Sequence, residues 1–212
     1  MDIHLLLSLA VIHTVALASP GPDFALVVKF SAEENRTVAI AAALGISVAI
    51  LGHTLLSLTG LSLIIHSSEQ LFMLVQLIGA CYLAWMGGNA ARAAFSHWRD
   101  PVSLQKLQKT QGLSSKQGFY QGLYTNLLNP KALVFFITLF STMITPQVSL
   151  TTKSAAAILL FTLSMLWFSL IATVLTKPAV QIKLKQLTPV INLITGLIFI
   201  SVALVIISGV IN

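Results

Sequence analysis

The sequence predicts an all-α integral membrane protein with six transmembrane helices arranged as two inverted three-helix repeats, in which helices 1 and 4 are interrupted at proline-containing motifs. Three observations support this fold class. Of the 212 residues, 56% are hydrophobic and 8% are charged, with a mean hydropathy of +0.90, whereas about a quarter of the residues in soluble domains are charged. Six long apolar runs divide the chain, and two proline motifs recur half a chain apart.

Each apolar run is long enough to cross a bilayer as a helix, which takes about 20 residues. The runs are continuously apolar rather than alternating, which favours helices over the strands of a membrane barrel. Asp2 directly precedes the first run, and no Lys or Arg lies near the start of that run, so we expect a retained span and not a cleaved signal peptide. The expected spans are Ile3–Val28, Thr37–Ile65, Leu71–Ala91, Gly118–Ile144, Ser154–Thr176 and Pro189–Asn212.

Basic residues are concentrated on one side of this topology. The gaps after spans 1, 3 and 5 contain ten Lys and Arg residues, whereas the gaps after spans 2 and 4 and both tails contain one, Lys153. Because basic loops stay in the cytoplasm, we expect both termini on the periplasmic side. The net charge of +6 does not predict nucleic-acid binding, since no basic stripe with interleaved aromatic residues is present.

The whole chain, residues 1–212, is expected to form a single transmembrane domain. A first repeat of about residues 1–98 and a second of about residues 118–212 are separated by a polar cytoplasmic linker of about residues 99–117. Each repeat has three spans, an odd number, so the second must enter the bilayer in the opposite direction. Inverted repeats of this kind are typical of secondary transporters.

Two charged residues lie inside the apolar runs, and each directly follows a proline. Asp23 ends the segment Ser19-Pro20-Gly21-Pro22-Asp23 in span 1, and Lys131 ends Asn129-Pro130-Lys131 in span 4, an offset of 108 positions. Proline removes a backbone donor and clashes with the preceding turn, so both helices should break there. Paired breaks at corresponding places in two halves indicate a substrate site.

A lone charge near the bilayer centre costs at least about 2.5 to 3.5 kcal/mol on insertion scales, so we expect Asp23 and Lys131 to face the bundle interior. A functional site is favoured over a structural ion pair because the helices break where the charges lie. Asp23 precedes Lys29 by six residues, about 9 Å of helix, so whether the charges are level and in contact stays open. Asn126 and Asn129 could bind substrate or satisfy the interrupted backbone.

Other polar and small residues have less specific interpretations. His13 and His53 lie within spans 1 and 2, where an imidazole could relay protons, and we favour a hydrogen-bonded structural role for each. Small residues four positions apart permit close helix contact inside a protomer or across a homodimer. Two such spacings are Gly45-x3-Ala49 and Gly118-x3-Gly122.

No sequence motif predicts an enzyme, a cofactor or a metal site. The chain lacks the HExxH pattern of zinc proteases, a phosphate-binding GxxxxGK[ST] loop, and any Cys and His spacing typical of metal ligands. A single cysteine, Cys81, excludes an intramolecular disulfide. We therefore expect no catalytic residues, no metal and no cofactor.

Four segments carry a resemblance to a known family. They are Ala18-Ser19-Pro20-Gly21-Pro22-Asp23, Leu44-Gly45-Ile46, Gly79 with Tyr82-Leu83-Ala84-Trp85-Met86-Gly87, and Thr125-Asn126-Leu127-Leu128-Asn129-Pro130-Lys131-Ala132. With them the sequence resembles the LysE/RhtB family of amino acid exporters over nearly its whole length, and within it the threonine and homoserine efflux branch. The resemblance implies a bacterial inner-membrane carrier that exports a small L-amino acid, driven by the proton motive force.

The resulting hypothesis is a secondary active exporter that works by proton antiport with alternating access, with the substrate, protons and membrane lipids as partners. The substrate ammonium would bind Asp23 and open carbonyls of the Pro20-Gly21-Pro22 break, and its carboxylate would bind Lys131 and an Asn amide. Two alternatives stay open: a uniporter or channel for small zwitterions, and a non-transporting membrane partner that assembles another complex. The exact amino acid, the proton stoichiometry and the oligomeric state also stay open.

Overall fold

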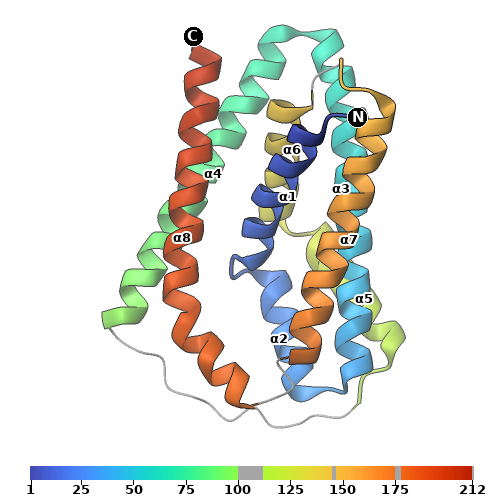
Figure 1. Ribbon diagram of the computed structural model, residues 1–212, viewed down its shortest axis with the longest axis vertical. Helices are drawn as coiled ribbons and strands as arrows, with labels where there is room; N and C mark the ends of the chain where they lie inside the picture. The colour runs from blue at the N-terminus through green and yellow to red at the C-terminus, as the bar shows by residue number, and fades with distance from the viewer. Residues whose placement is uncertain (100–111, 145–146, 175–177, 212) are drawn as a thin grey trace.

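The computed structural model describes residues 1–99, 112–144, 147–174 and 178–211. Within these ranges the protein is all helical and contains no strand, as predicted (Figure 1). The helices are α1 (Ile3–Ala18), α2 (Pro22–Glu33), α3 (Arg36–Ser67), α4 (Glu69–Arg99), α5 (Ser115–Leu127), α6 (Pro130–Met143), α7 (Leu150–Val174) and α8 (Pro178–Ile211).

Four helices, α3, α4, α7 and α8, contain stretches long and apolar enough to cross a membrane. The pairs α1 with α2 and α5 with α6 also pass this test when each is taken together, and each pair is bent by 58°. The described residues therefore provide four clear apolar spans, or up to six when each bent pair counts as one.

Both helix interruptions lie where the proline motifs predict them. In the first, α1 ends at Ala18, and the extended residue Gly21 precedes Pro22, the first residue of α2. In the second, α5 ends at Leu127, and α6 begins at Pro130. Proline suits the first position of a helix because its missing N–H would have no intrahelical partner there. Each break thus places the start of a new helix inside the bundle.

Several expected span boundaries differ from the structure, and two of them have a clear local cause. Span 4 was expected from Gly118, but α5 begins at Ser115 because Ser114 and Gln117 form a capping box that satisfies the first backbone donors. Span 6 was expected from Pro189, but α8 begins at Pro178 and continues through that proline. A proline removes one donor without always ending a helix. Residues 100–111 of the expected linker lie outside the described residues.

Small residues join α3 and α5 closely. A Cβ atom added to Gly122 would overlap the Ala42 carbonyl, and one on Gly118 would lie 2.7 Å from the Val38 carbonyl oxygen. Gly45 on α3 faces the backbone of α5 in the same way. The Gly118-x3-Gly122 spacing therefore serves a contact inside the protomer, where backbones approach more closely than side chains would allow.

The helices α4 and α8 pack on each other along their lengths and lie to one side of the other helices (Figure 1). They cross at two glycines: a Cβ on Gly87 would lie 2.6 Å from the Gly196 carbonyl oxygen, and one on Gly196 would lie 2.7 Å from the Gly87 carbonyl oxygen. This crossing fixes one wall of the interior space described below.

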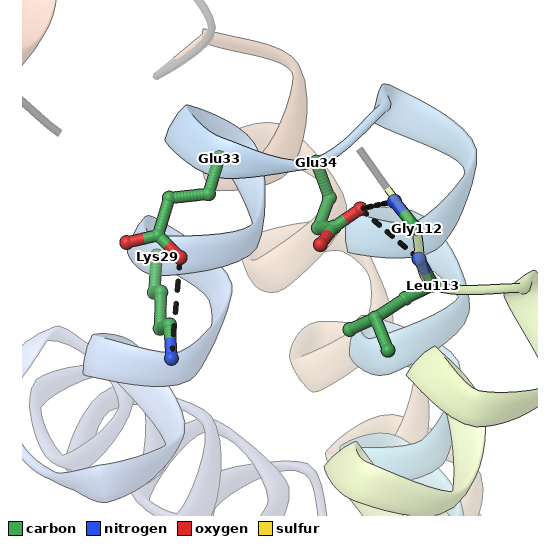
Figure 2. Close-up of polar contacts among 5 residues, drawn as sticks. All are labelled: Lys29, Glu33, Glu34, Gly112 and Leu113. Carbon is green, nitrogen blue, oxygen red and sulfur yellow. Dashed lines mark hydrogen bonds and ion pairs between the residues drawn. The ribbon is translucent and has the colours of Figure 1, made fainter. Parts of the chain in front are cut away.

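The two ends of the molecule hold different parts of the chain. Both termini lie at one end, and the α2–α3 turn, the end of α4 and the start of α8 lie at the other (Figure 1). At this second end Lys29 pairs with Glu33 at 3.9 Å, and Glu34 accepts hydrogen bonds of 3.4 Å from the backbone of Gly112 and Leu113 (Figure 2). Glu34 thereby ties the chain entering α5 to the end of α2.

Candidate functional site

The two helix breaks enclose a cavity of about 50 Å³. Its polar lining comes from both breaks, and its apolar lining comes from α1, α2, α3, α6 and α7. The polar and charged lining residues are His13, Ser19, Asp23, Asn126, Asn129 and Lys131, and the aromatic ones are Phe24, Phe135, Phe136 and Phe168. The sequence-predicted charges Asp23 and Lys131 therefore border one shared space.

The Asp23 carboxylate is held by two amide groups from the opposite break. Its Oδ2 accepts hydrogen bonds from Asn126 Nδ2 at 3.0 Å and Asn129 Nδ2 at 3.2 Å. The other carboxylate oxygen, Oδ1, and the Asn126 Oδ1 are buried with no hydrogen-bond partner among the described residues. Two acceptor atoms at the cavity wall are therefore free for a donor that the protein itself does not provide.

Lys131 borders the same cavity and contacts the first break. Its Nζ donates a hydrogen bond of 2.8 Å to Ser19 Oγ, and a Cβ added to Gly21 would lie 3.3 Å from the same nitrogen. Within the described residues no N–O contact of 4.0 Å or less joins Lys131 to Asp23. The opposite charges thus share a cavity without a direct ion pair, and each contacts the other helix break.

Asn129 has two structural roles at once. Its Oδ1 accepts a hydrogen bond of 3.0 Å from the Lys131 backbone nitrogen, which caps the start of α6. Its Nδ2 donates to Asp23. Of the two interpretations left open by the sequence, a contact that satisfies the interrupted backbone is observed for this residue, and substrate binding stays a prediction. The Asn amide nitrogens contact Asp23, whereas the sequence-based hypothesis placed one of them on a substrate carboxylate.

Both interior histidines are hydrogen bonded through Nε2. His53 Nε2 lies 3.2 Å from the Asn126 carbonyl oxygen, which can only accept, so Nε2 donates. His13 Nε2 lies 2.8 Å from Ser164 Oγ, whose own proton goes to the Leu160 carbonyl, so Nε2 donates here too. A neutral ring in this arrangement has its proton on Nε2, and Nδ1 of each histidine is buried without a partner in the described part of the chain.

The remaining predicted site residues shape the breaks. Gly21 lines the cavity, and Pro20 lines a neighbouring one. Pro22 and Pro130 are the first residues of α2 and α6. His53 is not part of the cavity lining but supports it, because it stacks on Phe136 with ring centroids 5.9 Å apart and an interplanar angle of 10°.

Sequence reasoning missed Ser19 and the aromatic walls as site residues. Ser19 directly precedes the Pro-Gly-Pro segment, so its place beside a helix break was the signal that could have identified it. The phenylalanines carry no such signal, because an apolar residue in an apolar run is equally suited to lipid or to a cavity wall. The described residues contain no cluster of three His, Cys, Asp or Glu side chains that could hold a metal ion.

Comparison with known proteins places this chain in a family. The model of the LysE type translocator matches residues 14–209. The threonine efflux protein of Escherichia coli (strain K12) is 32% identical over 195 residues, covering 92% of this chain and 93% of the relative. The threonine efflux protein of Salmonella typhi is 30% identical over the same shares of both chains. No solved structure matches the chain. The apolar helices and these relatives indicate a multi-pass membrane protein. The chain belongs to the LysE type translocator family.

Proposed function

We propose that this protein is a secondary active exporter of a small L-amino acid of the threonine or homoserine type, and that it works by proton antiport with alternating access. The observation that carries this proposal is the shared cavity at the two helix breaks, bordered by Asp23 and Lys131. Two opposite charges that border one cavity match the ammonium and carboxylate groups of a zwitterion. The printed names of the relatives support a threonine-like substrate.

The ammonium end of the substrate binds the Asp23 wall. The free Asp23 Oδ1 and Asn126 Oδ1 are both acceptors, and an ammonium group offers three donors. Because Asn126 and Asn129 already fix the other carboxylate oxygen, Asp23 is oriented before the substrate arrives. This preorganisation reduces the cost of binding.

The carboxylate end binds Lys131 and the start of α2. Ser19 takes one donor of the Lys131 ammonium, which leaves two for a substrate oxygen. Gly21 precedes α2 without a side-chain cap, so the backbone donors of this helix end are open to an anion. Half-helices that point their N-termini at a substrate carboxylate are a known device of transporters with broken helices.

Proton coupling follows because a proton and the substrate ammonium compete for the Asp23 carboxylate. When the substrate ammonium leaves on the outer side, a proton binds the exposed carboxylate oxygen, and the neutral carboxylic acid returns inward. A new substrate ammonium then displaces that proton into the cytoplasm. We assign His13 and His53 positioning roles, since each uses its Nε2 proton in a fixed hydrogen bond.

The orientation and repeat structure complete the proposal. Each half consists of a bent pair, α1–α2 or α5–α6, followed by two long helices, which supports two inverted repeats whose breaks meet at one cavity. The end of the molecule at which α3 begins with Arg36 and α4 ends faces the cytoplasm of a bacterial inner membrane, and both termini face the periplasm.

The test is transport by purified protein in proteoliposomes with labelled L-threonine. We expect the wild-type protein to catalyse threonine counterflow and to accumulate threonine when a pH gradient is imposed. Asp23→Asn should lose proton-driven flux by at least about 100-fold, because it removes the charge that binds both ammonium and proton. Glu33→Gln, which changes a carboxylate on the same helix that pairs with Lys29, is the matched control.

The alternatives give different results in the same assay. Threonine flux that ignores the pH gradient, in both the wild-type and the Asp23→Asn protein, would replace the antiporter with a uniporter or channel. No flux of any amino acid in a labelled panel, together with normal folding of an Asp23→Leu/Lys131→Leu double variant, would favour a non-transporting assembly partner.

A further inference from the structure

A second cavity, of about 330 Å³, adjoins the first on the other side of the Lys131 side chain. Its walls come from the α4/α8 pair and from the first helix break. The side chains that matter here are Tyr82, Asn89 and Ala90 of α4 and Asn192 and Phe199 of α8. Neither the family relationship nor the charged pair by itself assigns a role to this space.

The two cavities share Ser19 and Lys131 in their linings. The hydrogen bond of 2.8 Å between Lys131 Nζ and Ser19 Oγ therefore lies in the wall that separates them. A single ammonium group borders both spaces, so a carboxylate in either cavity can reach the same cation. A rotation of the flexible Lys131 side chain away from Ser19 would open this wall without breaking a helix.

Asn192 brings a polar amide to the lining of this cavity. The residue is only 8% exposed. Polar groups in such a lining are normally satisfied by protein, water or ligand. Its place in the lining, together with Asn89, indicates a ligand that has its own donors and acceptors.

The two cavities also differ in the size of ligand that they can hold. Small-molecule sites occupy about 300 to 1,000 Å³. The second cavity lies in this range, whereas the first, at about 50 Å³, holds a few water-sized groups. In this conformation a whole amino acid fits the second cavity, and the Asp23 cavity must widen before it can accept one.

The second cavity extends away from the termini. On α4 its lining runs from Tyr82 to Ala93, about 16 Å of helix, toward the end of α4 that lies opposite both termini (Figure 1). In the proposed orientation that end faces the cytoplasm. The first cavity includes His13 and Phe135, on α1 and α6, which both run from the breaks toward the terminal end.

We propose that the α4/α8 cavity is a cytoplasmic loading subsite, in which the exported zwitterionic amino acid binds before it reaches Asp23. Its carboxylate binds Lys131 and the Asn192 amide, and its ammonium faces the Asn89 amide oxygen. Separation of Lys131 from Ser19 then lets the ammonium move to Asp23 while the carboxylate stays on Lys131. This inference rests on the function proposed above.

The first measurement uses chemical modification after folding. Because Cys81 is the single cysteine, a Cys81→Ser background carrying Ala90→Cys has one thiol, in the second cavity. We expect N-ethylmaleimide to modify it and to abolish threonine counterflow. L-threonine at about ten times its half-saturating concentration should slow the modification about tenfold. Ser115→Cys in the same background, exposed at the start of α5, is the control and should react without protection or loss of flux.

The second measurement tests whether the Asn192 side-chain amide binds the substrate. Asn192→Leu should lower the kcat/KM of threonine counterflow about tenfold, because a hydrogen bond to a charged group is lost. Ile194→Leu, an exposed position on the same helix outside the cavity, should leave kcat/KM unchanged.

The results separate this inference from the proposed function. If the wild-type protein transports threonine and Asp23→Asn does not, but the Ala90→Cys thiol is unreactive or unprotected and its modification leaves counterflow intact, the loading subsite is wrong and the exporter stands. If the wild-type protein itself moves no amino acid, the proposed function fails first.

Discussion

The two helix breaks have the same bend, 58° each, but they are built from different chemistry. At the first, an extended glycine precedes α2 with no side-chain cap, and the acidic Asp23 lies in the first turn. At the second, Asn129 caps α6 through its side chain, and the basic Lys131 lies in the first turn. An acidic group is stabilising near a helix N-terminus and a basic group is not.

This difference shows which of the two charged residues can be explained by the stability of its own helix. The first break favours its own charge through the helix dipole, so Asp23 is compatible with a purely structural role. The second break carries a cation where the dipole opposes it, at a cost of about 0.3 to 1 kcal/mol in exposed helices. Lys131 is therefore hard to explain by helix stability, and the Asn129 cap offsets part of the cost. The four experiments below test this contrast.

The largest expected effect is that of Lys131→Met. Transport of threonine should fall by at least about 100-fold, since the cation on the substrate carboxylate is lost. The thermal unfolding temperature in detergent should stay the same or rise, because an unfavourable charge leaves the start of α6. Lys29→Met, at an exposed position on α2, is the control. A large drop in unfolding temperature with Lys131→Met would show that this lysine is structural.

The next effect is that of Asn129, whose cap and contact with Asp23 can be separated. Asn129→Ser keeps a capping oxygen but loses the amide donor to Asp23, and Asn129→Ala loses both. We expect both variants to lower threonine kcat/KM about tenfold, through the lost charge-assisted hydrogen bond. Only the Ala variant should also lose about 1 kcal/mol of unfolding free energy. Full activity of Asn129→Ser would limit this residue to capping.

A smaller effect is expected for His53, which hydrogen bonds to the Asn126 carbonyl oxygen at the second break. His53→Gln keeps a donor that can reach the Asn126 carbonyl oxygen, whereas His53→Leu leaves that hydrogen bond unmade. We expect His53→Leu to lower threonine kcat/KM about fivefold, which corresponds to a hydrogen bond worth about 1 kcal/mol, and His53→Gln to retain proton-driven flux. Loss of pH-gradient dependence in His53→Gln, with counterflow preserved, would instead make His53 a proton relay.

The smallest effect is expected at Gly21. A Cβ at this position would lie 3.3 Å from Lys131 Nζ, and the end of a flexible lysine can move by a few tenths of an ångström. Gly21→Ala should raise the KM for threonine about threefold while kcat changes little, since the shift costs well under 1 kcal/mol. Gly88→Ala, where an added Cβ meets no atom within 4 Å, is the control. An unchanged KM would mean that Lys131 reaches the substrate from another position.

Much of the fold was predictable because bilayer length and proline chemistry act locally. The apolar runs predict helices, and the breaks follow from residues 20–22 and Pro130 alone. The boundaries at Ser115 and Pro178 were missed because they depend on a cap formed across three residues and on the tolerance of a helix for one internal proline. These details are decided by small free energies that composition does not reveal.

The site was predictable in its charges but not in its arrangement. Asp23, Lys131 and the two asparagines were identified as the polar residues at the breaks, and they line one cavity. Their depth was unresolved because a straight helix would place Asp23 about 9 Å from the inner surface, and a bend of 58° changes that geometry. The pairing of both asparagines with Asp23 depends on contacts across more than 100 positions, which a single sequence does not encode locally.

The glycine contacts between α3 and α5 constrain how the protein can change shape. Carbonyl groups of α3 fill the space that side chains would occupy at Gly118 and Gly122, so neither helix can slide or roll on the other without a backbone collision. Asn126 belongs to α5, and His53, which holds its carbonyl, belongs to α3. One wall of the Asp23 cavity therefore moves as a single rigid body, and the displacement that opens the cavity must come from the helices facing it.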